Sequence, residues 1–329
     1  MADVARIAGV SPMTVSRAFK RDSAVSEATR KAILTAAEDL GYVFDTTASN
    51  LRSQKTDFIA AIVPSINNAN FADTVRGLSE GLKDRGLQIL LGYTDYDMVE
   101  EESLIEQLLR RRPEAIVVTG GRHTPRARRL LENAAMPVIE TWDLPDNPVG
   151  HVVGFSNAQA VRGMVDHFVA QGLTRIAFIG GDASRDTRGA DRRAGFVNAM
   201  KEHGLDATRL IAAGQPPISM REGAEAMERL LETLPDTQAV ICVSDPSAFG
   251  ALTECQRQGI DVPGRMSIAG FGDYEISAVS VPSLTTINPH PNQIGTETAK
   301  LILEMLDYPD NPPKRVQIIP HLLIRQSSC

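Results

Sequence analysis

The sequence lacks a long hydrophobic run, a secretory leader and a cysteine framework, and each absence excludes a class of protein. No stretch approaches the ~20 apolar residues that a membrane-spanning helix needs, so no membrane partner is expected. The start of the chain has neither a basic cluster nor an apolar segment, which argues against secretion. Three cysteines, an odd number without metal-ligand spacing, fit neither a disulfide framework nor a metal site. We therefore expect a protein of the reducing cytoplasm.

The chain also lacks the short motifs of several enzyme classes. No GxGxxG opens a predicted helix, and no GxxxxGKS/T phosphate loop is present. Neither HExxH nor GxSxG occurs, and the six histidines have no metal-ligand spacing. We therefore expect neither an enzyme nor a bound cofactor.

Charge is distributed unevenly along the chain. The 329 residues carry a formal net charge of −7, which by itself argues against a nucleic-acid binder. Residues 1–31, however, contain six basic and three acidic residues, so the negative charge lies in the remainder. A basic head on an acidic body suits a protein that contacts phosphates at one end only.

Three short helices are expected near the N-terminus, at residues 3–10, 12–19 and 27–40. Gly9 can adopt the left-handed conformation that ends the first helix. Ser11 is a good N-cap for the second helix, with Pro12 tolerated at its first position, and Ser26 caps the third. Apolar residues at helical spacing form the predicted core of this bundle: Val4, Ile7, Ala8, Val15, Ala18, Phe19, Ala32, Ile33, Ala36, Ala37 and Leu40.

The second predicted helix has a polar face suited to the major groove of DNA. Two short helices joined by a tight glycine turn, with a third as support, form a helix-turn-helix. The exposed face carries Met13, Thr14, Ser16 and Arg17. Arginine pairs with guanine through two hydrogen bonds, and hydroxyl groups hold phosphates. From spacing alone, the alternative is a three-helix cap without a role in DNA binding.

Fixed positions in this segment resemble a known family. Residues 3–17 resemble the DVAxxAGVSxxTVSR signature of the lactose-repressor (LacI/GalR) family, and the pattern continues at Val25-Ser26, Thr29-Arg30 and Leu40-Gly41-Tyr42. The resemblance implies a sequence-specific repressor whose recognition helix contacts operator DNA through Ser11, Pro12, Met13, Thr14, Ser16 and Arg17. Met13 and Arg17 are expected to carry more of the base choice, because Pro12 has little hydrogen-bonding capacity. Family members usually have several residues before this motif, so the resemblance also implies a start upstream of Met1.

The next segment, residues 45–57, is polar and has no sustained apolar stripe, which alone predicts a linker. In the LacI/GalR family this segment becomes a short hinge helix on DNA, and its leucine wedges into the minor groove and bends the duplex. The resemblance places Leu51 at that position and Ala48 one turn earlier. The predicted domains are therefore a helix-turn-helix at 1–44, a hinge at 45–57 and a large domain at 58–329.

In the large domain, apolar runs alternate with amphipathic helices. The expected strands are 58–63, 87–93, 115–119, 138–140, 175–180, 210–213, 239–243 and 266–271, with helices between them at 72–85, 101–111, 158–171, 189–203, 219–234 and 246–258. Near-continuous apolar strands that alternate with helices predict parallel sheets covered on both faces. The strands are too many for one small sheet, so we expect an α/β fold of two doubly wound lobes. Ligands then bind in the cleft beyond the carboxyl ends of the strands.

The large domain also resembles the core of the LacI/GalR family, which is similar to periplasmic sugar-binding proteins. The matching segments are Val63-Pro64-Ser65, Gly154-Phe155, Arg192-Arg193-Ala194-Gly195-Phe196, Ser244-Asp245, Gly270-Phe271-Gly272-Asp273 and Leu284-Thr285-Thr286-Ile287. Carried over by position, the effector-binding residues are Ser65, Asn70, Phe71, Trp142, Arg192, Ser244, Asp245, Phe271 and Gly272. Arg192 stands where the family places an arginine that clamps its ligand. Phe71 and Asp245 each have an alternative to a role in ligand binding. Phe71 can be a core residue, and Asp245 can serve only to start a helix.

Departures from the family pattern predict the charge of the effector. Many sugar-binding members have Asn-Asp at the position of Ser244-Asp245, and Gly272 stands where many have an aspartate. Fewer carboxylates and more arginine favour an anionic ligand. Arg122 and His123 add two donors at the rim of the cleft, unless they form only a solvated loop. Segments 123–125 and 153–157 resemble gluconate-operon repressors, so the expected effector is a sugar acid such as gluconate, with a neutral sugar or a phosphosugar as the alternative.

The assembly follows from the single helix-turn-helix, which predicts a homodimer on a pseudopalindromic operator. Residues 323–329 form no heptad tail, which argues against a tetramer built through a C-terminal coiled coil. Two other classes stay open, an enzyme of sugar acids and a periplasmic binding protein. The helix-turn-helix argues against both of them, and the missing leader argues against the second. A ligand between the lobes is expected to change their relative angle and thereby the affinity for DNA.

Overall fold

The computed structural model describes residues 1–19, 24–44, 56–181 and 185–328 of the chain. They divide into two compact units, Met1–Thr56 and Asp57–Cys329. Ala48 and Leu51 of the predicted hinge lie outside the described residues. None of the helices in the described ranges is long and apolar enough to cross a membrane.

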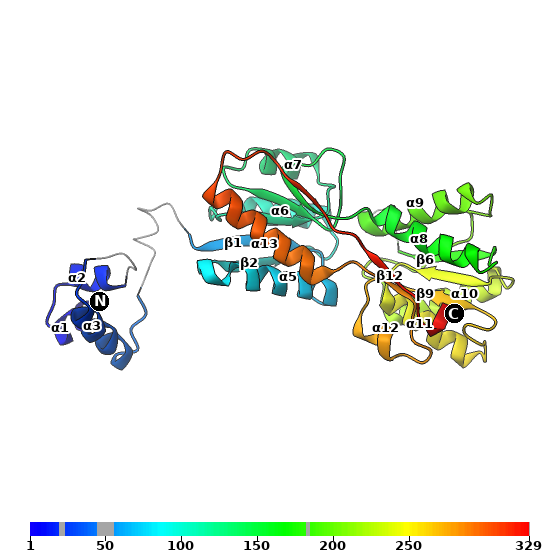
Figure 1. Ribbon diagram of the computed structural model, residues 1–329, viewed down its shortest axis with the longest axis horizontal. Helices are drawn as coiled ribbons and strands as arrows, with labels where there is room; N and C mark the ends of the chain where they lie inside the picture. The colour runs from blue at the N-terminus through cyan, green and yellow to red at the C-terminus, as the bar shows by residue number, and fades with distance from the viewer. Residues whose placement is uncertain (20–23, 45–55, 182–184, 329) are drawn as a thin grey trace. The chain divides into compact units, whose positions relative to one another are not determined.

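The N-terminal unit contains the helices α1 (Ala2–Ile7), α2 (Pro12–Ala18) and α3 (Glu27–Asp39), close to the expected positions (Figure 1). At the start of α2 the backbone N–H of Thr14 donates to the hydroxyl of Ser11 at 3.2 Å. The backbone N–H of Thr29 makes the same contact with Ser26, also at 3.2 Å, at the start of α3. Gly9 follows α1 with a φ of 63°, the left-handed conformation that glycine adopts without strain. Local capping therefore determines where these helices begin and end.

The core of this unit differs from the expectation at three positions, one of which is Ala32, exposed on the surface of α3. Val4, Val15 and Ile33 are fully buried where the three helices meet. Ile7 and Leu40, which the apolar spacing places inside, are 51% and 45% exposed. α1 is six residues long and buries the side that carries Val4, so Ile7 falls at its edge. Leu40 comes after the last turn of α3, beyond the reach of the helix packing.

The first lobe of the larger unit is a parallel sheet with the strand order β11-β5-β4-β3-β1-β2. Its strands are β1 (Phe58–Val63), β2 (Gln88–Tyr93), β3 (Ile116–Thr119), β4 (Val138–Thr141), β5 (His151–Gly154) and β11 (Arg315–Gln317). Alternate residues of β1 face opposite sides: Ile59 packs with the core under α5 (Ala69–Leu82) and α13 (Pro291–Asp307), whereas Ile62 packs under α6 (Met98–Leu109) and α7 (Pro125–Glu132). Helices therefore cover both faces of this sheet (Figure 1).

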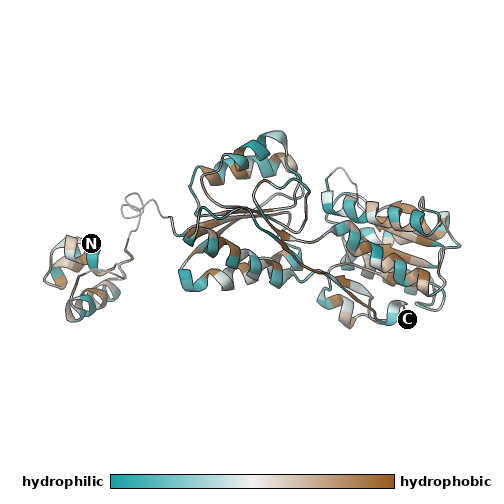
Figure 2. Cartoon of the chain, turned by 45° about the horizontal axis from the view of Figure 1, so that its top comes forward, coloured by the Kyte–Doolittle hydropathy of each residue, from teal (hydrophilic) through white to brown (hydrophobic). Residues whose placement is uncertain are grey.

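The second lobe is a smaller parallel sheet with the order β7-β6-β8-β9. Its strands are β6 (Ile176–Gly180), β7 (Leu210–Ala212), β8 (Ala239–Cys242) and β9 (Ser267–Ala269). The helices α8 (Asn157–Ala170) and α9 (Thr187–Glu202) pack together, as do α10 (Met220–Thr233) and α11 (Asp245–Arg257), and α12 (Glu275–Val279) lies against α11. Figure 2 shows hydrophobic strands between helices whose outer surfaces are hydrophilic, as expected for a sheet covered on both faces.

Within the described residues, the chain passes between the lobes after β5, between β10 (Thr286–Asn288) and α13, and between β11 and β12 (His321–Leu323). β10 and β12 pair as an antiparallel ladder, in which Ile287 lies opposite Leu322. The last part of the chain thus contributes α13 and β11 to the first lobe and returns to the second. The expected fold of two doubly wound lobes is confirmed.

Several elements of the larger unit were not expected from the sequence. α7 is only eight residues long and rich in arginine, so few apolar residues mark it in the sequence, and α13 begins at a proline and contains a glycine. β5 and β10–β12 have three or four residues each, too few for a clear alternation of polar and apolar positions. Contacts with the rest of the sheet determine these elements, and local sequence contributes little.

Candidate functional site

One face of α2 packs in the core of the N-terminal unit, and the other face is exposed. Val15 and Ala18 are buried against the other helices of the N-terminal unit, whereas 66% of Met13 is exposed. The predicted DNA-contacting residues of this helix are exposed or partly buried: Ser11, Pro12, Met13, Thr14, Ser16 and Arg17.

A second candidate site is a cavity of about 360 Å³ between the two lobes, which we call the interlobe cavity. It lies where the carboxyl ends of strands from both sheets meet, the usual ligand site of doubly wound folds. Its polar lining residues are Ser65, Asn67, Asn68, Asn70, Tyr96, Asp186, Arg188, Arg192, Ser219, Ser244 and Tyr274. Its apolar lining residues are Phe71, Trp142, Pro216, Pro217, Ile218, Met220, Val243, Pro246 and Phe271.

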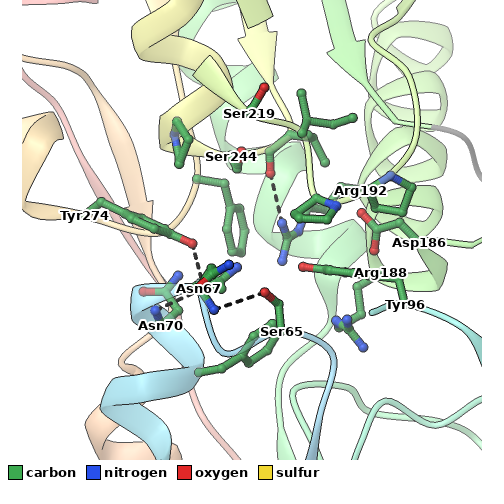
Figure 3. A pocket seen from close by; sticks show the side chains of 18 of the residues that line it. Ser65, Asn67, Asn70, Tyr96, Asp186, Arg188, Arg192, Ser219, Ser244 and Tyr274 are labelled. Carbon is green, nitrogen blue, oxygen red and sulfur yellow. Dashed lines mark hydrogen bonds between the residues drawn. The ribbon is translucent and has the colours of Figure 1, made fainter. Parts of the chain in front are cut away.

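Arg192 extends from α9 into the interlobe cavity (Figure 3). Its Nε donates to Oδ1 of Asn157 and its Nη1 to the carbonyl oxygen of Val243, both at 2.9 Å. The guanidinium carbon lies 3.6 Å from the centre of the Phe271 ring, a cation–π contact. Burial lowers the pKa of Arg192 to about 10, so the side chain remains charged at neutral pH. Two bonds and one ring therefore orient a cation whose remaining N–H groups are available to a ligand.

The position of α9 against α8, and with it the direction of Arg192, depends on a glycine one turn after Arg192. A Cβ on Gly195 would lie 2.3 Å from the carbonyl oxygen of Ala158, so α8 and α9 approach backbone to backbone at this point. Any larger residue would push α9 away from α8 and displace Arg192 from the cavity. The spacing of Arg192 and Gly195 in the sequence thus has a geometric cause.

A second arginine, Arg188, lies one turn before Arg192 on α9 and is buried. Its Nη1 donates to the carbonyl oxygen of Thr119 in the first lobe at 3.4 Å. Its guanidinium carbon lies 5.6 Å from the centre of the Phe71 ring and 5.9 Å from that of Tyr96. Burial raises the pKa of Tyr96, which is therefore a neutral hydroxyl at the cavity. Two cations and the phenol of Tyr96 thus occupy one end of the interlobe cavity.

Amide and hydroxyl groups line the opposite side of the cavity. The hydroxyl of Tyr274, from the second lobe, donates to Oδ1 of Asn68 in the first lobe at 2.6 Å. The same oxygen accepts the backbone N–H of Asn70 at 3.0 Å and caps α5. Asn67 and Ser65 lie beside them, joined by a backbone N–H to hydroxyl bond of 3.2 Å (Figure 3). Such groups suit a ligand with several hydroxyls.

Aromatic rings form a continuous contact across the two lobes. Trp142 lies 5.3 Å from Phe71 and 5.9 Å from Phe155, measured between ring centres, and Phe155 stacks on Phe271 at 6.0 Å. The amide of Asn157, at the crossover after β5, donates to the carbonyl oxygen of Trp142 at 3.0 Å. Because Asn157 also accepts from Arg192, it links the aromatic contact to the cation.

The structure brings seven of the predicted effector residues together in the interlobe cavity: Ser65, Asn70, Phe71, Trp142, Arg192, Ser244 and Phe271. It does not place Arg122, His123, Asp245 or Gly272 on the wall of this cavity. Asp245 is fully buried, and its carboxylate accepts from the hydroxyl of Thr286 at 2.6 Å and from the backbone N–H of Tyr274 at 2.8 Å. Asp245 is the first residue of α11, so the alternative interpretation of this residue as a helix start describes its position.

Gly272 has a structural position next to the cavity. Its φ is 131°, and a Cβ there would lie 2.4 Å from the ring of Tyr274 and 2.8 Å from Nδ2 of Asn70. An aspartate would not fit, because these two side chains occupy the space. The sequence comparison indicated that this chain has a glycine where many family members have an aspartate. In the structure, this glycine lies where side chains of the two lobes approach closely.

The loop of Arg122 and His123 is neither solvated throughout nor part of the cavity wall. Arg122 forms an ion pair with Asp191 of α9, across the two lobes. The side chain of His123 is 1% exposed, with Nδ1 2.6 Å from Oε1 of Glu101 and Nε2 3.3 Å from Oε1 of Glu140. Burial disfavours the charged ring, but the Glu101 hydrogen bond and the two carboxylate charges outweigh it and raise the pKa of His123 to about 9. His123 therefore compensates buried carboxylates.

Sequence reasoning missed most of the second-lobe residues of the cavity, together with Asn67, Asn68 and Tyr96 of the first lobe. Arg188 could have been found, because it lies four residues before Arg192 and so on the same face of a helix. The asparagines 67 and 68 follow the predicted strand 58–63 directly, at the edge where ligands bind. Asp186, Ser219 and Tyr274 gave no comparable signal, since only the tertiary structure brings their loops to the cavity.

The described residues contain no group of three or more histidine, cysteine, aspartate or glutamate side chains that could hold a metal ion. Cys242 and Cys255 are buried, and burial raises the pKa of both thiols, that of Cys255 to about 12. The polar side chains of the interlobe cavity suit an organic ligand with hydroxyl and anionic groups.

A helix-turn-helix unit followed by two doubly wound lobes around a polar cavity is typical of a DNA-binding transcriptional regulator. Residues 1–45 match the model of the bacterial regulatory proteins of the lacI family, and residues 165–328 match the periplasmic binding protein-like domain. The chain is 34% identical over 304 residues to the HTH-type transcriptional regulator GntR of Pseudomonas aeruginosa, covering 92% of this chain and 88% of that protein. The chain belongs to the LacI family of transcriptional regulators.

Solved structures agree with this assignment. A LacI family transcriptional regulator from Silicibacter pomeroyi superposes with a TM-score of 0.92 at 32% identity, covering 99% of this chain and 98% of that one. Another LacI family regulator from the same organism has 42% identity and a TM-score of 0.79, covering 82% of this chain and 98% of that one. LacI family regulators bind operator DNA, and this chain carries their DNA-binding unit.

The buried His123 gives a testable pH dependence of stability. Because its folded-state pKa of about 9 exceeds the ordinary value of 6.5, its contribution is fully present below pH 6.5 and is lost as the pH rises through 9. We expect the free energy of unfolding of the wild type to fall by about 3 kcal/mol across this window, relative to His123→Gln. Urea unfolding between pH 6 and pH 9.5 measures it.

His203→Gln serves as the control, because His203 pairs with Asp166 at the surface. It should follow the wild-type profile. If His123→Gln and the wild type showed the same pH profile, the charged state of His123 would be refuted.

Proposed function

We propose that this LacI-family regulator is a repressor whose effector is a sugar acid such as gluconate, bound in the interlobe cavity. The observation that carries the proposal is the pair of arginines, Arg188 and Arg192, against the single carboxylate of Asp186, in a cavity whose other polar side chains are amides and hydroxyls. A carboxylate satisfies guanidinium groups through charge-assisted hydrogen bonds, while the polyol chain of a sugar acid satisfies Asn and Ser side chains.

The resemblance to gluconate-operon repressors supports the same effector class. The relatives named GntR include that of Escherichia coli, 31% identical over 316 residues. A neutral sugar would leave the positive charge of the wall without a partner, which argues against it. Operator binding by α2 and effector binding by the larger unit are then linked, with a typical coupling of about 1–3 kcal/mol, or 5–150-fold in affinity.

We further propose that the regulator acts as a homodimer. The edge strand β2 exposes Leu91 and Tyr93, and the segment at the end of α12 exposes Val279 and Val281. Exposed apolar side chains of this size on a strand edge favour association with another chain. A dimer presents two recognition helices to the two halves of a pseudopalindromic operator.

The effector assignment is tested by isothermal titration calorimetry. Gluconate and 2-ketogluconate should bind, whereas glucose and glucose 6-phosphate should bind at least tenfold more weakly. Arg192→Ala should weaken gluconate at least tenfold, because the carboxylate loses its oriented partner. The neighbouring Arg193→Ala, which removes a bond to the carbonyl oxygen of Gly181 outside the cavity, should bind like the wild type. Glucose as the only ligand would overturn the proposal.

The role of α2 is tested by operator binding. After selection of a preferred duplex from random sequences, Arg17→Ala should weaken its binding by about 1–3 kcal/mol, the value of one bidentate base contact. Arg110→Ala removes a surface arginine of the larger unit and should have no effect on DNA affinity. Both variants should titrate gluconate normally. Equal loss of duplex affinity in the two variants would contradict the assignment of α2.

A further inference from the structure

The wall of the interlobe cavity holds one carboxylate beside its two arginines. Among the described residues, the acidic and basic side chains that line the cavity are those of Asp186, Arg188 and Arg192. Burial raises the pKa of Tyr96 and of Tyr274, so both phenols stay neutral. The charged groups on the wall therefore sum to a single positive charge.

The carboxylate of Asp186 faces the cavity rather than capping its own helix. Asp186 is the N-cap residue of α9, yet its side chain makes no capping hydrogen bond. Its Oδ2 lies only 2.1 Å from where a Cβ of Gly189 would stand, so the absent side chain of Gly189 leaves the space that Asp186 occupies. Figure 3 shows Asp186 between Arg192 and Tyr96 at the cavity. Its charge also acts on Arg192, whose pKa it raises against the larger effect of burial.

Asp245 adds negative charge behind the wall without offering an oxygen to the ligand. Its carboxylate is fully buried and held by Thr286 and by the backbone of Tyr274. Burial raises the pKa of Asp245 to about 6, so the group is largely ionised above neutral pH. It therefore acts in the same direction as Asp186 against additional negative charge in the cavity.

From this arrangement we infer that Asp186 is a specificity-determining residue that restricts the effector to sugar acids with a single negative charge. One carboxylate neutralises the wall, and the hydroxyls of the ligand can donate to Asp186. A second anionic group leaves an unbalanced negative charge in a partly buried site, facing a fixed carboxylate. The inference rests on the proposed sugar-acid effector and excludes aldaric acids and phosphorylated sugar acids.

The test compares gluconate with glucarate and 6-phosphogluconate by calorimetry of the full-length chain. Glucarate has the same six carbons and one more carboxylate, so it separates charge from size. The wild type should bind gluconate at least tenfold more tightly than either. Asp186→Asn keeps the shape of the side chain and removes its charge, so it should reduce this preference for gluconate over glucarate at least tenfold.

Asp191→Asn is the matched control, because Asp191 lies on the same helix, pairs with Arg122 and does not line the cavity. It should retain the wild-type ratio of the two affinities. The role of Asp186 would be overturned if Asp186→Asn kept the wild-type ratio of gluconate to glucarate affinity. This outcome counts when the variant shows normal thermal unfolding and the wild type binds gluconate. Should Asp186→Asn unfold, Asp186→Ser gives the same comparison. Absence of binding of any sugar acid to the wild type would instead overturn the proposed function.

Discussion

The constraint on which the larger unit depends is the placement of guanidinium groups in the crevice between two lobes. A cation removed from water needs acceptors, and Arg192 finds them in Asn157, Val243 and the ring of Phe271. These partners come from the first crossover, the end of β8 and the segment after β9. Orienting one side chain therefore requires both sheets and a crossover to be in place, which makes the cavity a property of the whole unit.

Contacts between the lobes connect this cavity to the shape of the unit. Tyr274 binds Asn68, Arg188 reaches Thr119, and Arg122 pairs with Asp191, each across the two lobes. A ligand that meets residues of both lobes adds to this set and favours the arrangement in which they meet. In the function that we propose, such a bias is the physical link between occupancy of the cavity and the affinity for operator DNA.

Much of the fold could be predicted, but less of the site. Apolar runs and amphipathic helices identified most strands and helices of the two lobes, because parallel strands buried on both faces are strongly hydrophobic. The segment of Arg122 and His123 shows where this reasoning fails. Charged side chains near the end of a strand suggested ligand contacts, yet His123 is enclosed by Glu101 and Glu140 and Arg122 pairs with Asp191. The sequence does not indicate which charges will find protein partners.

By itself the sequence determined the N-terminal helices, their serine caps and the glycine turn, since each depends on residues within one turn of helix. The resemblance to the LacI/GalR family also pointed to Arg192, a residue that the structure places on the wall of the cavity. Only the tertiary structure decided that Arg188, Asp186, Tyr274 and the loop at Ser219 meet around one cavity. Their positions are far apart in the sequence, and the folding of two sheets brings them together, so no local pattern could record the contact.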